Sequence, residues 1–202
     1  MRFITGWRLA ATLSLLLCAA CAGIVADMGF TVEAMQAAIR FTARTSFALF
    51  CLAFSASALF RLWPTDWSRW QRQNRRYLGV SFAASHLLHA LALGGFAFVD
   101  PTLFRATNGP GMFVAGGIAY LFIALMAATS FDATAKWIGP RAWRLLHWTG
   151  SYYIAISFLT AFGKRIAVDP LYAVPVAILV GALVLRGVSW SQQRSRSRVV
   201  AE

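Results

Sequence analysis

The chain has 202 residues, of which 59% are hydrophobic and 13% are charged, with a formal net charge of +12. A soluble domain is about 45–50% apolar, so this composition and a mean hydropathy of +0.61 exclude an ordinary water-soluble domain. A charge of +12 could indicate nucleic-acid binding. The arginines, however, lie at the ends of apolar runs, where they orient membrane spans, so we expect a membrane protein in contact with lipid and no nucleic-acid partner.

Six apolar runs are long enough to cross a membrane, since a span needs roughly 20 apolar residues. They cover residues 4–26, 45–62, 77–99, 112–131, 142–162 and 171–188. We interpret the first run as an uncleaved span rather than a signal peptide, because more spans follow it. The three cysteines, Cys18, Cys21 and Cys51, all lie in apolar runs and form neither a disulfide framework nor a paired CxxC metal site.

Short segments join these runs. Residues 32–39 could form a helix along the membrane surface, residues 63–76 form a basic loop rich in tryptophan, and residues 132–141 form a short loop. The arginine- and serine-rich end of the chain is predicted to be disordered. We therefore divide the chain into a six-span domain, residues 1–190, and a basic cytoplasmic tail, residues 191–202.

The distribution of basic residues predicts the orientation. With the N-terminus in the cytoplasm, only five of the 19 basic residues lie outside, namely Arg40, Arg44, Arg105, Lys164 and Arg165. Cytoplasmic loops carry an excess of Lys and Arg, so we predict an all-α membrane protein, a six-transmembrane-helix bundle with both termini cytoplasmic. No segment outside the runs is long enough for a soluble catalytic domain, and the chain has no P-loop and no GxGxxG fingerprint.

All three histidines lie inside apolar runs. His86 and His89 are in the third run, three residues apart and so on one helical face, and His147 is near the start of the fifth. A polar side chain in hydrocarbon normally faces a partner, a cavity or a cofactor. One imidazole from each of two helices is the usual way to hold a b-type haem, so we predict haem between these runs, with the three histidines as candidate iron ligands.

Other interpretations of the histidines stay open. Each imidazole could bond a serine or a carbonyl, or belong to a proton path. A zinc or copper transport site is disfavoured, because the cysteines lie on the first two runs and not beside the histidines.

Three short motifs stand, in this order, at the starts of the second, third and fifth runs. They are Phe41-Thr42-Ala43-Arg44, Arg75-Arg76-Tyr77-Leu78-Gly79 and Trp143-Arg144-Leu145-Leu146-His147. Together with the six-run layout, the set resembles the ferric reductase-like transmembrane family. Within that family it is similar to the haem-binding membrane subunit of the bacterial periplasmic methionine sulfoxide reductase system. The resemblance covers nearly the whole chain.

The resemblance implies a function and a location. It implies a haem b subunit of the bacterial inner membrane that passes electrons from a cytoplasmic or quinol donor to a periplasmic molybdenum-cofactor reductase. Such a chain is an electron-transfer subunit of an oxidoreductase and makes or breaks no substrate bond itself. FMN or quinone would donate electrons at the basic inner loop. Two alternatives are a direct ferric or cupric reductase and a haem-free membrane transporter or assembly factor.

The resemblance also implies residue roles. By position, His89 and His147 are similar to the axial ligands, and Arg44, Arg75 and Arg76 are similar to residues that contact haem propionates or quinone. Family members often carry a further histidine 13 residues after the position of His147, where this chain has Thr160. His86 is additional to the family pattern.

The pairing of the histidines stays open at this stage. If the third and fifth runs end at one depth, the 1.5 Å helical rise gives an offset of roughly 9 Å between His89 and His147, and of about 4–5 Å between His86 and His147. We expect one haem with His147 as a ligand, paired with His89 on family position or with His86 on depth. Two haems with incomplete ligation are the alternative.

Overall fold

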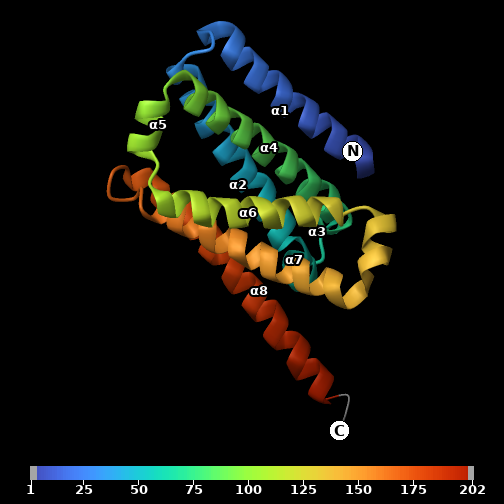
Figure 1. The fold of residues 1–202 in the computed structure, drawn as a ribbon. Coiled ribbons are helices and arrows are strands. Elements are labelled where there is room, and N and C mark those ends of the chain that lie inside the picture. The colour runs from blue at the N-terminus through green and yellow to red at the C-terminus, as the bar shows by residue number, and fades with distance from the viewer. Residues whose placement is uncertain (1–3, 200–202) are drawn as a thin grey trace.

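The structure is a computed structural model that describes residues 4–199 and the side chains of residues 4–195. Every element in this part of the chain is helical, which confirms the all-α prediction. The elements are α1 (Gly6–Met28), α2 (Val32–Leu62), α3 (Asp66–Gln73), α4 (Arg75–Val99), α5 (Pro101–Thr107), α6 (Pro110–Ala128), α7 (Asp132–Gly163), the 3₁₀ helix η1 (Pro170–Tyr172) and α8 (Ala173–Val199). In Figure 1, α6 and α7 run side by side across α2 and α4, and the C-terminal part of α8 extends beyond the bundle.

Two segments predicted as loops are helical. Within residues 63–76, α3 forms because Thr65 and Ser68 make a reciprocal capping box that satisfies the first free backbone N–H groups. The segment 132–141 forms the first part of α7. A kink separates it from the rest, where Gly139 adopts a φ of +77° directly before Pro140. Glycine tolerates that conformation, and the proline ring prevents a straight helix.

Two other boundaries also differ from the prediction. The proposed surface helix and the second apolar run form one continuous helix, α2, because no Gly or Pro interrupts residues 40–44. Its N-terminus is capped by the Thr31 side chain, which accepts a hydrogen bond from the Ala34 N–H at 3.2 Å. The disorder predicted for the tail is wrong as far as Val199, since α8 continues to that residue. Residues 200–202 lie outside the described part.

Five helices are long and apolar enough to cross a membrane. They are α1, α2, α4, α6 and the segment Pro170–Ser195, which contains η1 and most of α8. The multi-pass membrane character predicted from composition is thus confirmed at this level. The helix α7, which contains the fifth apolar run, is not among the five. It is long enough, with 32 residues, so its composition, which includes His147, two tyrosines and several serines and threonines, leaves it outside that set.

The packing of the bundle centres on α2, which contacts α4 more extensively than any other pair of helices contact each other. The interface between them is rich in small hydroxyl side chains, and Thr42, Ser46 and Ser85 are fully buried in it. Ser85 Oγ lies 2.9 Å from both Ser46 Oγ and Thr45 Oγ1. Small residues let membrane helices approach closely, and hydroxyl groups bond across them, so this contact fixes α4 against α2.

Several chain segments meet at one end of the bundle. The Gly6 N–H donates to Asn74 Oδ1 at 2.9 Å, and the Trp7 ring packs against Tyr77 and Phe131. The start of α1, the corner between α3 and α4, and the turn before α7 therefore lie together. We call this the basic end, because the arginine-rich segment between residues 61 and 76 is part of it.

The substitution Ser85→Ala tests the α2–α4 contact. It removes the hydroxyl that bonds Thr45 and Ser46, and we expect it to lower the free energy of unfolding by about 1 kcal/mol, the scale of interhelical hydrogen bonds in membranes. Ser157→Ala is the matched control, because the Ser157 hydroxyl bonds only the Tyr153 carbonyl of its own helix. Equilibrium unfolding in mixed micelles measures both. Equal losses for the two variants would contradict the assigned role of Ser85.

Candidate functional site

Two of the three histidines lie together where α4 meets α6 and α7. The rings of His86 and His89 are stacked, with centroids 5.4 Å apart. The His86 ring also lies 5.3 Å from the ring of Tyr120 on α6 and 6.1 Å from that of Phe158 on α7. Phe82, one turn earlier on α4, completes the aromatic surroundings at 5.1 Å from His86. The side of α4 predicted to face a flat cofactor is therefore lined by aromatic rings from three helices.

The hydrogen bond of His89 favours one tautomer of its ring. His89 Nδ1 lies 2.9 Å from Thr42 Oγ1 on α2. When the Thr42 hydroxyl donates its own proton to the Ala38 carbonyl, 2.6 Å away, its oxygen accepts the proton on Nδ1. A neutral imidazole has one N–H and one lone pair. In this tautomer Nε2 of His89 carries the lone pair, which is the form of histidine that binds a metal.

Two buried polar atoms at this site have no hydrogen-bond partner among the described residues. They are His86 Nδ1 and the Tyr120 hydroxyl, on facing helices. A buried polar group without a partner costs about 1–3 kcal/mol. An unsatisfied pair is therefore expected to be retained only where a ligand, a water or a further group completes it.

His147 has a different environment on α7. Its Nε2 lies 3.1 Å from Thr129 Oγ1, just after the end of α6. When the Thr129 hydroxyl donates to the Leu125 carbonyl, 2.7 Å away, it accepts from Nε2–H, and in this tautomer the lone pair is on Nδ1. The Trp143 ring stacks on the imidazole with centroids 4.2 Å apart. His147 is thus oriented by a threonine in the same way as His89, but through its other nitrogen.

The structure does not bring His147 to the level of the other two histidines. On α6, the neighbours of the two sites, Tyr120 and Thr129, are nine residues apart, which is about 14 Å of helix. On α7, Phe158 and His147 are 11 residues apart, or about 16 Å. Both helices place the two histidine levels on the order of 15 Å apart.

The depth comparison made from the sequence assumed that the two runs end at one level, which would place His86 opposite Gly150 of α7. The structure instead places it beside Phe158. This eight-residue difference corresponds to about 12 Å, because α4 extends beyond the end of α7. Neither His86 nor His89 is a close partner of His147 in this arrangement.

The three candidate arginines do not converge on one site. Arg75 donates to Ser57 Oγ at 3.0 Å. Its positive charge is close enough to the His147 imidazole to interact with it electrostatically. Arg76 forms an ion pair with Asp132 and by this hydrogen bond lowers the pKa of the Asp132 carboxyl. Arg44 lies beside the Tyr172 hydroxyl, 13 residues before Ser57 on α2 and therefore about 20 Å from it along the helix.

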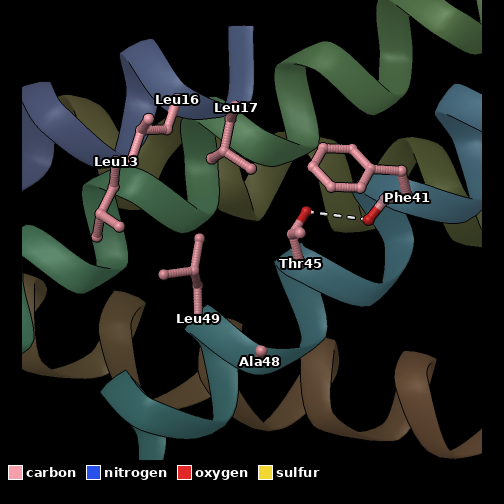
Figure 2. Close-up of a pocket in the computed structure, with 7 residues that line it drawn as sticks. All are labelled: Leu13, Leu16, Leu17, Phe41, Thr45, Ala48 and Leu49. Carbon is pink, nitrogen blue, oxygen red and sulfur yellow. Dashed lines mark hydrogen bonds between the residues drawn. The ribbon is translucent and has the colours of Figure 1, made fainter. Parts of the chain in front are cut away.

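A separate apolar groove lies between α1 and α2, with a volume of ≈ 270 Å³. Figure 2 shows its seven lining residues, Leu13, Leu16, Leu17, Phe41, Thr45, Ala48 and Leu49. The hydroxyl of Thr45, the one polar side chain among them, bonds the Phe41 carbonyl at 3.1 Å. None of these seven side chains ligates a metal or titrates, so we assign no chemistry to the groove.

Three residues of the site were not predicted from the sequence. Thr42 and Thr129 orient the histidines, and Tyr120 contributes the second unsatisfied polar atom. Tyr120 and Thr129 lie inside the fourth apolar run, which is the same signal that identified the histidines, whereas Thr42 lies just before the second run. The histidine partners of Thr42 and Tyr120 are 47 and 34 residues away, however, and only the packing of the helices reveals them.

The side chains at the α4 site could hold a cofactor that brings its own metal. Among the described residues, no three His, Cys, Asp or Glu side chains gather to bind a bare metal ion. Comparison with protein-family models, curated proteins and solved structures finds no match for this chain.

Proposed function

We propose that this chain is a haem b membrane subunit that transfers electrons across the bacterial inner membrane, as a six-span bundle with both termini in the cytoplasm. One observation carries the proposal. Inside a helix able to cross a membrane, His89 keeps an uncommitted Nε2 lone pair, beside the unpartnered Nδ1 of His86. Histidines that lie inside a membrane helix and keep a free nitrogen lone pair are typical of axial haem ligation.

The sixth span of the proposal is α7. After Pro140, residues 141–163 form a helix about 34 Å long, enough for a hydrocarbon core of about 30 Å. The arrangement at the basic end supports the proposed orientation. The start of α1, the α3–α4 corner and the start of α7 meet there with most of the arginines, as the positive-inside rule requires of one cytoplasmic face.

The residues of the α4 site could bind one face of a haem. The Thr42 bond would hold the His89 ring, and the rings of Phe82, Tyr120 and Phe158 would exclude water. Haem, when bound, supplies a one-electron Fe(III)/Fe(II) couple.

The residues do not fit a single haem held by His89 and His147 together. Two axial nitrogens are about 4 Å apart, because each metal–imidazole bond is roughly 2 Å long. The two histidine levels are separated by several times that distance. We therefore propose two haem positions with incomplete ligation by histidine, one at His89, with His86 beside it on the same face of α4, and one at His147.

The surroundings of His147 suit the haem position that lies nearer the basic end. Arg75 supplies a positive charge there that could pair with a propionate, as charge-assisted bonds to guanidinium do. Arg76 is held by Asp132 and Arg44 lies far away, so we assign them no propionate. A quinol or flavin donor at the basic end and a periplasmic molybdenum-cofactor reductase as acceptor complete the proposal, on the resemblance of the three motifs.

Alanine variants of the histidines test the haem assignment. In protein expressed with haem supply, we expect His89→Ala and His147→Ala each to lose about half of the bound haem, because each removes one ligand position. The Soret absorbance per protein measures the loss, and Thr160→Ala is the control on the same helix as His147. Wild-type protein without a Soret band would contradict the proposal and favour a haem-free transporter or assembly factor.

Thr42→Val tests how His89 is positioned. Loss of a hydrogen bond that orients a metal ligand typically costs 10–100-fold in affinity. We expect a 10–100-fold weaker binding of haem at the α4 position, with Thr42→Ser restoring most of it. Thr160→Val is the control, because the Thr160 hydroxyl bonds only Ser157 of its own helix. Haem titration of the apoprotein gives the affinities, and an unchanged value for Thr42→Val would refute this role.

A further inference from the structure

Four arginines from four helices converge on the last two turns of α2. We call them the arginine cluster: Arg61 of α2, Arg72 of α3, Arg75 of α4 and Arg186 of α8. Arg61 Nε donates to the Ser57 carbonyl at 3.0 Å, and Arg75 Nη1 donates to the Ser57 hydroxyl at 3.0 Å. Arg186 Nη1 donates to the Phe54 carbonyl at 2.8 Å. The Arg72 guanidinium lies 4.6 Å above the Phe60 ring.

The cluster has four positive charges and, among the described side chains, no carboxylate paired with them. The ion pair found among the described side chains joins Arg76 to Asp132, outside the cluster. The positive charge of Arg75 is repelled by the nearby charges of Arg61, Arg72 and Arg186. Carbonyls near the end of α2 supply only the partial negative charge of a helix C-terminus, about half a charge. The cluster is therefore electrostatically incomplete without an anion.

Most of the donor groups in the cluster remain available. Each guanidinium has five N–H donors. The bonds above occupy one each on Arg61, Arg75 and Arg186, and Arg186 Nε also donates to the Tyr152 hydroxyl at 3.4 Å. Arg61, Arg72 and Arg75 are exposed, and Arg186 is half-buried. A phosphate presents several oxygens to such donors and pairs with arginine in a two-pronged geometry.

The surroundings of the cluster point to the membrane as the source of the anion. Trp63 and Trp67 follow Arg61 along the chain, and Trp190 lies one turn after Arg186, and all three are at least half exposed. Exposed tryptophans concentrate at the level of lipid headgroups. Basic pockets between membrane helices at the cytoplasmic face bind acidic headgroups.

We propose that the arginine cluster binds the phosphate headgroup of an anionic phospholipid, at the junction of α2, α3, α4 and α8. This site shares Arg75 with the haem position proposed at His147, and its other three arginines have no part in that position. The site tethers α8, whose C-terminal part extends beyond the bundle (Figure 1), to the α2–α4 pair.

The test uses the full-length protein in neutral detergent and native mass spectrometry. Phosphatidylglycerol and phosphatidylcholine are titrated against wild type, Arg61→Gln/Arg72→Gln and a control, Arg40→Gln/Arg105→Gln. The control removes two exposed arginines far from the cluster. We expect preferential binding of phosphatidylglycerol to wild type. The cluster variant should bind it roughly 30-fold more weakly, as expected for loss of two near-surface cations, and the control should bind within twofold of wild type.

Three results would overturn the proposal. One is equal binding of both lipids, and another is an unchanged affinity in the cluster variant. The third is displacement of the lipid by inorganic phosphate or by a single-stranded oligonucleotide at equal concentration, which would identify a general anion site. Partial recovery in Arg61→Lys/Arg72→Lys would support the charge argument over misfolding. Haem content should be unchanged in the cluster variant, so failure of this proposal is distinguishable from failure of the electron-transfer proposal.

Discussion

The buried hydroxyl contact between α2 and α4 is the constraint on which the candidate site depends. Hydrocarbon offers no water to polar groups, so each hydroxyl and imidazole in a span must find a partner inside the protein. Thr45, Ser46 and Ser85 satisfy one another across the interface, and Thr42 satisfies His89 in the same row. The contact therefore does two things at once. It holds two spans at close range, and it directs one imidazole with a defined free nitrogen.

A threonine also orients the histidine at the second level. Thr129 receives a ring N–H of His147 while its own proton goes to a backbone carbonyl. His147 lies close to the positive charge of Arg75, whereas His89 stacks on His86, which lies among aromatic rings. Two imidazoles of one chain thus have different electrostatic surroundings. Charge, exposure and hydrogen bonding tune the potential of a bound haem, so the two levels are expected to differ in potential.

The sequence predicted the helical class, because apolar runs of about 20 residues have few other structures available to them. It also identified the histidines, since a polar residue is conspicuous in hydrocarbon. It did not predict that residues 32–62 form one helix, or that α3 and the start of α7 are helical. Those outcomes depend on local caps and on the kink at Gly139–Pro140.

The relative depth of the histidines could not be predicted from the sequence. Counting residues from the ends of two runs gives depth only if the helices end at one level, and α4 extends beyond α7. The partner of His86 is therefore Phe158, eight residues from the expected level. The orienting threonines were hidden for a similar reason, because Thr42 and His89 are 47 residues apart in the chain.

We propose that the chain carries haem at two separate levels. A potentiometric titration of the purified, haem-supplied protein, combined with its haem-to-protein ratio, tests this proposal. We expect a ratio approaching two and two reduction steps of different midpoint potential. A protein that binds no haem would refute the haem assignment, and a ratio of one with a single reduction step would refute the two-level arrangement.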